Sequence, residues 1–199
     1  DLEATPGDHE VLVVDDGGPE DLAGFLRAEF PSVRCLTLPQ NLGFARAVGE
    51  GLKTSTKPLF VLLNSDMVVR PGFLRHLLVP FRHARTFGVC SDIQMASGPR
   101  LQTGVPRGAF TGMIWLEFDS PSVLRPVLYA GGGCSAYHRA KWDHLGGFDP
   151  GYHPFYWEDV DIGIRAWRQG WLSLNQPSAS AIHKHRATIG SFYRPRFVE

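Results

Sequence analysis

Short apolar runs that stop at a turn alternate with amphipathic helical patterns over the first 81 residues of this chain. Three runs have the composition or the alternation of strands: 11–14, 33–38 and 59–63. Three stretches place apolar residues at helical spacing: 22–30, 44–52 and 71–81. Because strands that alternate with helices build a sheet covered on both faces, we expect an α/β fold with a mostly parallel central sheet.

The second half of the chain is less regular. Residues 91–126 are rich in Gly, Pro and Ser, and we expect loops and irregular strands there. A strand is expected at 128–138, where three consecutive glycines at 131–133 indicate a bulge or the close approach of another group. The remaining expected elements are helices at 139–145 and 158–169 and two closing strands at 171–174 and 179–183.

Length and composition predict one globular domain over residues 1–199. Twenty basic residues balance twenty acidic ones, so the overall charge does not indicate a nucleic-acid partner. The widely spaced Cys35, Cys90 and Cys134 form no disulfide or zinc pattern, and we expect free thiols. Because the chain starts at Asp1 and has no signal peptide, we expect a fragment of a longer cytoplasmic protein.

Carboxylates follow two of the expected strands. Asp66 comes just after the apolar run 59–63, where it can bind a hard divalent cation with Asn64 beside it. Asp15 and Asp16 follow the run 11–14, where acids can accept hydrogen bonds from a nucleoside N–H or from ribose hydroxyls. Turn formation is the alternative in both places, because Asn, Ser, Asp and Gly are common turn residues.

Three acids open the last expected helix, directly behind an aromatic run that includes Tyr156 and Trp157. Aromatic neighbours can desolvate a carboxylate and tune it as a base, or stack on a sugar ring. The alternative is that Glu158, Asp159 and Asp161 only complement the helix dipole, with Asp161 paired to Arg165 four residues later. Because adjacent helix positions point in different directions, we expect only one of Glu158 and Asp159 to face a site.

Two histidines lie near the end of the last strand. Alternation would put His183 and His185 on one side of the chain, and imidazole nitrogen can ligate a divalent metal. Incidental exposure is the alternative, because the chain has eight histidines.

In its ordered motifs the chain resembles the family 2 glycosyltransferases of the GT-A fold, from about residue 11 to about residue 190. Five motifs carry the resemblance: Val13-Val14-Asp15-Asp16-Gly17-Gly18, Asn41-Leu42-Gly43-Phe44-Ala45, Leu62-Leu63-Asn64-Ser65-Asp66, Gly146-Gly147-Phe148-Asp149 and Trp157-Glu158-Asp159-Val160-Asp161. Residues 155–161 together with the late histidines look most like bacterial rhamnosyltransferases of surface-polysaccharide synthesis.

The resemblance implies a role for each matching position. The implied nucleotide-binding residues are Asp15, Asp16, Asn41, Arg46 and Asn64. The implied ligands of a Mn²⁺ or Mg²⁺ ion are Asp66 and His183. The implied catalytic pair is Glu158 and Asp159, with Asp159 as the base. The implied contacts to donor or acceptor sugar are Gly132, Gly133, Tyr156, Trp157 and His185.

The implied function is an inverting, metal-dependent, non-processive hexosyl transfer from a nucleotide-diphosphate sugar to a glycan or lipid-linked acceptor. Such an enzyme would be cytoplasmic, or peripheral at the inner face of the cell membrane. One departure is that the family's first strand and helix would precede residue 11, so we expect this chain to lack them. A non-catalytic nucleotide-sugar or glycan-binding module is the alternative, and a nucleotidyltransferase is disfavoured because Gly17-Gly18 has no neighbouring Lys or Arg.

Overall fold

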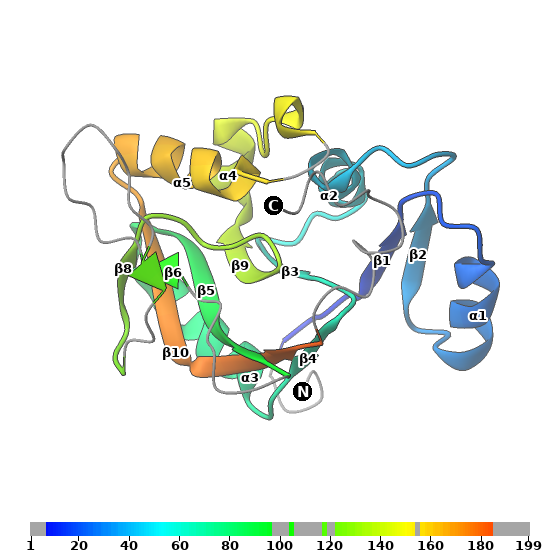
Figure 1. Ribbon diagram of the computed structural model, residues 1–199, viewed down its shortest axis with the longest axis horizontal. Helices are drawn as coiled ribbons and strands as arrows, with labels where there is room; N and C mark the ends of the chain where they lie inside the picture. The colour runs from blue at the N-terminus through cyan, green and yellow to red at the C-terminus, as the bar shows by residue number, and fades with distance from the viewer. Residues whose placement is uncertain (1–6, 97–103, 106–116, 119–121, 154–155, 185–199) are drawn as a thin grey trace.

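The computed structural model describes residues 7–96, 104–105, 117–118, 122–153 and 156–184 (Figure 1). The strands are β1 (Leu12–Asp15), β2 (Arg34–Thr37), β3 (Leu59–Leu63), β4 (Met67–Val69), β5 (Thr86–Met95), β6 (Gly104–Val105), β7 (Glu117–Phe118), β8 (Arg125–Val127), β9 (Cys134–His138) and β10 (Leu172–His183). The helices are α1 (Leu22–Glu29), α2 (Phe44–Lys53), α3 (Phe73–Leu78), α4 (Arg139–Leu145) and α5 (Glu158–Arg168), with 3₁₀ turns η1 (Val79–Arg82) and η2 (Pro150–Tyr152). No helix within these described ranges is long and apolar enough to span a bilayer.

A six-stranded mixed sheet forms the centre of the described part of the chain (Figure 1). Its strand order is β3-β9-β5-β10-β4, and β8 also pairs with β10. The β5–β10 pair is parallel, whereas β9 runs antiparallel to β3 and β5, and β4 and β8 run antiparallel to β10. β1 and β2 form a separate parallel pair. The α/β architecture is as expected, but the central sheet is mixed instead of mostly parallel because β9 runs against both of its neighbours.

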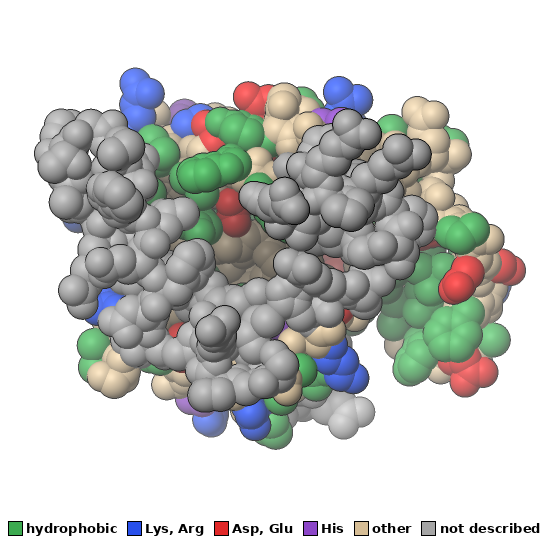
Figure 2. Space-filling view, viewed as in Figure 1, with side chains coloured by type: hydrophobic (Ala, Val, Ile, Leu, Met, Phe, Trp, Pro, Cys, Tyr) green, Lys and Arg blue, Asp and Glu red, His purple; other side chains and the backbone are tan. Residues whose placement is uncertain are grey.

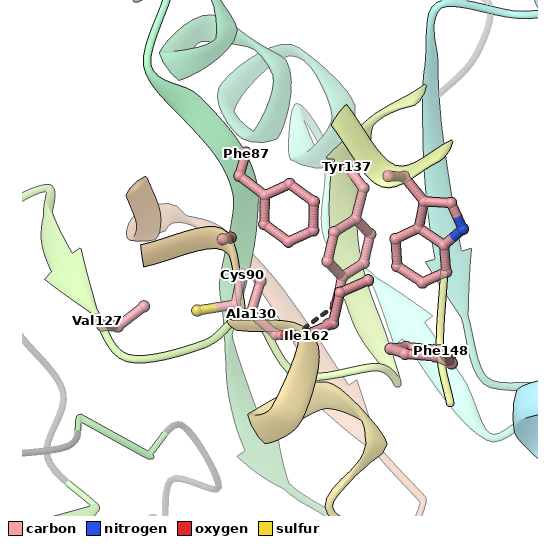
Figure 3. Packing of buried hydrophobic residues seen from close by; sticks show 9 residues of the cluster. Phe87, Cys90, Val127, Ala130, Tyr137, Phe148 and Ile162 are labelled. Carbon is pink, nitrogen blue, oxygen red and sulfur yellow. Dashed lines mark hydrogen bonds between the residues drawn. The ribbon is translucent and has the colours of Figure 1, made fainter. Parts of the chain in front are cut away.

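The sheet is covered on both faces. Helices α2, α4 and α5 lie on one side and α3 on the other (Figure 1). On the α4 and α5 side, a cluster that includes Phe87, Tyr137 and Trp142 fills the core, and Tyr137 and Trp142 meet edge to face with ring centroids 4.9 Å apart. The buried Tyr137 hydroxyl donates to the carbonyl oxygen of Ala130 (Figure 3). On the opposite side, Phe73 and Leu77 of α3 pack against a second buried cluster.

Local signals fix where the helices begin and end. The Asp21 side chain caps α1 by accepting from the Gly24 N–H at 2.8 Å. Helix α4 ends at Gly146, whose φ of 79° lies in the left-handed region that favours glycine. Gly146 therefore ends α4 as the sequence predicts.

Three expectations about single elements also need correction. Residues 91–95 are a regular part of the ten-residue strand β5, where loops and irregular strands were expected; Gly88, Ser91 and Asp92 break its apolar pattern, and pairing with β9 and β10 holds it instead. The strand expected at 128–138 starts only at Cys134, because Gly132 and Gly133 form a turn. The two closing strands are one strand, β10, whose pairing with β5 shifts register between Gln176 and Ser180.

The free-thiol expectation is confirmed. Cys90 and Cys134 are buried free cysteines, Cys35 is a partly buried one, and no disulfide joins them. Burial raises the pKa of the Cys90 thiol to about 12, which keeps the sulfur protonated and unreactive at neutral pH.

Candidate active site

The turn at residues 131–133, between β8 and β9, is where the separate site motifs meet. The Gly132 N–H donates to Asp159 Oδ2 at 3.1 Å, and the Gly133 carbonyl accepts from the Asn64 N–H at 2.8 Å. A Cβ on Gly132 would lie 2.9 Å from the Phe44 ring, and one on Gly133 would lie 2.9 Å from Asn64 Nδ2. These approaches are closer than side chains tolerate, so the turn needs glycine for space.

Asp159 stands at the start of α5 and points at this turn. Besides the bond from Gly132, its Oδ1 accepts from the Val160 N–H at 2.8 Å. Burial raises the pKa of the Asp159 carboxyl, and the backbone donors act in the opposite direction by stabilising the anion. The result is a largely dry carboxylate held in one orientation, which suits a general base.

Glu158 is directed elsewhere. Its side chain is buried, and within the described chain its Oε2 atom has no hydrogen-bond partner. Burial raises the pKa of the Glu158 carboxyl to about 7, and the neighbouring Asp159 charge adds to the increase. The expectation that these neighbours point in different directions fits the geometry, with Asp159 on the glycine turn and Glu158 in the interior.

The backbone in front of α5 is strained. Trp157 has a φ of 80°, the one positive φ on a non-glycine residue among those described. A left-handed conformation is costly for a bulky aromatic residue and is common at functional sites. Tyr156 and Trp157 are 55% and 56% exposed, so the aromatic side chains expected as a sugar-binding wall are accessible. Figure 2 shows a hollow near the middle of the face of the molecule that is turned toward the viewer, with the red of acidic side chains visible inside it.

Asp66 lies in the short turn between β3 and β4, and it meets a strand from the far end of the sequence. Its Oδ2 lies 3.0 Å from Nε2 of His183, the last residue of β10. The Met67 N–H bonds to the Asn64 carbonyl at 3.1 Å, and the Lys184 N–H bonds to the Asp66 carbonyl at 2.9 Å. The two side chains expected to bind a metal are therefore adjacent, although they are 117 positions apart in the chain.

A carboxylate oxygen and an imidazole nitrogen suit Mn²⁺ or Mg²⁺ only with further oxygen ligands. In the part of the chain that the structure describes, no three His, Cys, Asp or Glu side chains gather as a metal site. Asp66 and His183 would thus supply two ligands, and substrate phosphates and water the others. His185, the other histidine expected near the site, lies outside the described residues.

Most residues expected to bind the nucleotide lie at the C-terminal end of β1 and around the start of α2, and Asn64 follows β3. Asp16 accepts from the N–H groups of Leu42 at 2.7 Å and Gly43 at 3.0 Å, and Asp15 accepts from the Gly18 N–H at 2.9 Å. The exposed Asn41 side chain also accepts from Gly43, at 3.1 Å. Both acids thus hold local backbone, which is the turn-forming alternative, and each carboxylate retains lone pairs for a ligand.

Helix α2 connects this segment to the glycine turn. Phe44, its first residue, packs against Gly132 and against Phe148, with the two phenyl centroids 5.8 Å apart. Arg46, two residues further along the chain, is exposed. Sequence reasoning placed Phe44 in the expected helix 44–52 and in a family motif, but gave it no role in the site; its position directly after a glycine helix start was a signal that it could support the site.

A second supporting residue is Arg165. It pairs with Asp161 at 2.6 Å, which fits the expected ion pair, and its guanidinium also donates to the carbonyls of Leu145 at 2.6 Å and Gly147 at 2.8 Å. Because those carbonyls end α4, Arg165 ties the end of α4 to the first turn of α5 that carries Asp159. The sequence signal was the four-residue spacing, which predicts the ion pair but not the carbonyl contacts.

Residues 2–146 match the model of Glycosyl transferase family 2. The chain belongs to this family. Two curated relatives from Mycobacterium tuberculosis strains, both N-acetylglucosaminyl-diphospho-decaprenol L-rhamnosyltransferases, are each 30% identical over 92% of this chain and 69% of their own length. Polypeptide N-acetylgalactosaminyltransferase 11 of Xenopus tropicalis is 26% identical over 93% of this chain and 34% of that protein.

Solved structures confirm the GT-A fold of this family 2 member. GalNAc-T7 with UDP, GalNAc and Mn²⁺ superposes with a TM-score of 0.71 at 16% identity. A mannosyltransferase from Pyrobaculum calidifontis in complex with GDP-Man and Mn²⁺ gives 0.63 at 14% identity. The chain spans 37% and 48% of the lengths of these two proteins. The family membership and the fold identify a glycosyltransferase of rhamnosyltransferase-like character.

Proposed function

We propose that this chain catalyses the inverting, metal-dependent, non-processive transfer of a sugar from a nucleotide-diphosphate sugar to an acceptor hydroxyl. The observation that supports this most directly is the glycine turn at residues 131–133. One side of it binds the Asp159 carboxylate, and the other side binds the Asn64 backbone two residues before Asp66. A base on one side of the turn and the proposed metal ligand Asp66 on the other side suit sugar transfer, in which one group takes the acceptor proton and the other holds the leaving diphosphate through the metal.

Asp159 is the proposed base. As the acceptor oxygen attacks the anomeric carbon from the face opposite the diphosphate, its proton passes to the Asp159 carboxylate and the bond from carbon to the diphosphate oxygen breaks. The backbone N–H groups of Gly132 and Val160 keep the carboxylate oriented before and after it takes the proton. The glycine turn, with no side chains of its own, lets the donor sugar approach the backbone closely.

Asp66 and His183 are the proposed holders of a Mn²⁺ or Mg²⁺ ion. When bound, such an ion stabilises negative charge on a leaving diphosphate. Mn²⁺ accompanies the nucleotide or nucleotide sugar in both solved neighbours, which supports a divalent cation in general. The Asp66–His183 contact orients the carboxylate, so the imidazole also acts as a positioning group.

Asp15, Asp16, Asn41, Arg46 and Asn64 are proposed to surround the nucleotide. Asp16 holds the entrance of α2 through Leu42 and Gly43, so its role includes fixing the shape of this pocket wall. The Gly18 N–H is already bonded to Asp15. An amide engaged in this way is not available to cradle a phosphate, which disfavours the nucleotidyltransferase alternative.

The proposed acceptor is lipid-linked or a glycan, and the proposed place of action is the cytoplasmic face of the cell membrane. The Mycobacterium tuberculosis relatives, named for a decaprenol-linked diphosphate acceptor, support the lipid-linked form. The exposed Tyr156 and Trp157 are the proposed wall for the sugar or the acceptor, because flat aromatic rings stack on sugar faces.

The proposed function is tested by incubating the protein with UDP-, GDP- and dTDP-sugars, Mn²⁺ and a polyprenyl-diphosphate-sugar acceptor. Acceptor-dependent release of nucleoside diphosphate, with an inverted anomeric configuration seen by NMR, is the expected result. Release of pyrophosphate would indicate nucleotidyl transfer instead. Saturable donor binding without turnover on any acceptor would favour the non-catalytic binding module, and retained configuration would contradict the inverting mechanism.

A further inference from the structure

The stretch from β4 to the middle of β5 concentrates positive charge. Residues 67–91 contain four arginines, two histidines and no acidic residue. The chain as a whole balances twenty basic residues against twenty acidic ones, so this stretch departs sharply from the rest. Its charge is therefore a local property of one surface and not of the whole protein.

Helix α3 and turn η1 divide these residues between two faces. Phe73, Leu77 and Pro80 are buried against the sheet, at helical spacing. Arg75, Val79 and Arg82 follow the same spacing and are exposed on the opposite side. We call this exposed stripe, together with its neighbours Arg70, His83 and Arg85, the α3 basic face.

The charges of the α3 basic face are not neutralised by acids. In the ranges that the structure describes, none of its four arginines forms an ion pair with Asp or Glu. Arg70 donates to the neutral Gln94 side chain at 3.0 Å, and Arg85 donates to the Gly170 carbonyl at 2.8 Å. Both arginines bond to uncharged partners and are held in place by these bonds.

Hydrophobic side chains are exposed among these arginines. Val79, in the middle of the stripe, is 45% exposed, and Val68 on the adjoining strand β4 is 43% exposed. Figure 2 shows Lys, Arg and His side chains along the lower edge of the molecule, next to hydrophobic ones, in the region of α3 in Figure 1. Arginines that flank exposed valines complement a bilayer surface, where the cations meet anionic headgroups and the apolar groups enter the interface.

We propose that the α3 basic face docks on the surface of an anionic lipid bilayer. A nucleic acid would also attract the arginines, but it would make no contact that buries Val68 and Val79, and the described residues of the face include no exposed Phe, Tyr or Trp for stacking on bases. Asp66 is separated from this face by only the three residues of β4. These three residues span only about 10 Å, so docking would hold the Asp66–His183 pair near the membrane.

The test is co-sedimentation of the protein with vesicles, without any substrate. Wild type is expected to bind vesicles of phosphatidylglycerol mixed with phosphatidylcholine and to dissociate from them at high salt. It is expected not to bind vesicles of pure phosphatidylcholine. The Arg75→Gln/Arg82→Gln variant should partition about 25-fold less, the product of about fivefold for each lost arginine. Val79→Asn should weaken binding while leaving the salt dependence unchanged.

A matched control removes the same charge elsewhere. Arg27→Gln/Lys53→Gln changes two exposed cations on α1 and α2 and should bind vesicles like wild type. Equal loss of binding in the control and in the Arg75→Gln/Arg82→Gln variant would overturn the proposal, as would absence of wild-type binding to anionic vesicles. Equally strong binding to heparin or RNA with the same dependence on Arg75 and Arg82 would also overturn it.

The docking proposal stands apart from the proposed enzymatic activity. Vesicle binding needs no donor, and donor turnover measured with a detergent-dispersed acceptor should be the same in wild type and in the Arg75→Gln/Arg82→Gln variant. Thermal melting of each variant checks that the fold is intact. Loss of vesicle binding with unchanged Tm and detergent activity is the pattern that assigns the arginines to docking alone.

Discussion

The Asp159 carboxylate is held by the backbone of Gly132, with 3.1 Å between Oδ2 and the amide nitrogen. This bond joins the first turn of α5 to the loop between β8 and β9, and the next residue of that loop bonds to Asn64 at the end of β3. The proposed base Asp159 and the segment that carries the proposed metal ligand Asp66 are thus both fixed by the glycine turn at residues 131–133. Changes to either partner should alter catalysis more than stability.

Asp159→Asn removes the base and keeps an oxygen that can accept from Gly132. Turnover should fall by about 10²–10⁴-fold, the usual effect of losing a general base, while donor affinity changes little. Steady-state kinetics together with donor binding by calorimetry give the two quantities. Asp143→Asn, which alters an exposed acid paired with Arg139 on α4, should keep wild-type turnover. An Asp159→Asn enzyme as fast as wild type would remove Asp159 from the mechanism.

Gly132→Ala tests the glycine turn. The new methyl group would lie 2.9 Å from the Phe44 ring, so either the ring or the turn must move. Movement of the turn shifts the Gly132 N–H away from Asp159, and kcat/KM should fall by up to about 10²-fold. Gly49→Ala on α2 is the control, because its methyl group would meet nothing within 4 Å. Equal activity of both variants would show that the turn tolerates a side chain.

His183→Ala tests the metal assignment. Without the imidazole, Asp66 loses the partner at 3.0 Å that orients it, and the Mn²⁺ concentration for half-maximal activity should rise by about 10–100-fold. Asp66→Ala should abolish metal-stimulated activity. The exposed His83→Ala serves as control. A Mn²⁺ titration of all three variants, after treatment with EDTA, provides the comparison; identical curves for His183→Ala and wild type would exclude His183 as a ligand.

Glu158→Gln should change how stability depends on pH. The pKa of the buried Glu158 carboxyl is raised to about 7, so the folded protein holds this proton more tightly than the unfolded chain. The associated stability is present below about pH 4, the range of an unfolded glutamate, and is lost as the pH rises through about 7. Glutamine cannot ionise, so this loss should be absent in the variant.

The measurement is thermal melting of wild type and Glu158→Gln at pH 4 and pH 8. At pH 4 the two should melt close together, and at pH 8 the variant should melt about 6–12 °C higher, which corresponds to about 3 kcal/mol. Glu29→Gln at the exposed end of α1 should leave the wild-type pH dependence unchanged. A constant difference between Glu158→Gln and wild type at all pH values would contradict ionisation of a buried Glu158.

Strong local patterns allowed much of the fold to be predicted. The helices at 22–30, 44–52 and 139–145 have clear apolar spacing or glycine stops, and the structure places α1, α2 and α4 there. Strand β5 was missed because its central residues include Gly88, Ser91 and Asp92, and its conformation comes from pairing with β9 and β10. Such pairing is tertiary and leaves no periodic signal in the strand itself.

The same distinction applies to the candidate site. The types of residue in it could be predicted, because carboxylates after apolar runs and acids behind aromatic residues are local features. Local patterns do not predict their partners: Asp66 meets His183 across 117 positions, a pairing that only the family resemblance implied, and Asp16 bonds to Leu42 across 26 positions, which nothing in the sequence indicated. The double use of Asp16, as a holder of backbone and as a proposed nucleotide ligand, is visible only once that long-range contact is known.

Strand β10 connects the core of the sheet with the candidate metal site. Residues 172–175 are fixed in the hydrophobic interior beside β5 and β8, whereas residues 181–183 run along β4 to the acid at position 66. The residues between Gln176 and Ser180 have no partners on β5, so their number decides which side chain arrives at that acid. Slippage of residues 181–183 by a single position would present Ile182 or Lys184 in place of the imidazole, and it would also turn the buried Ala181 out of the hydrophobic interior.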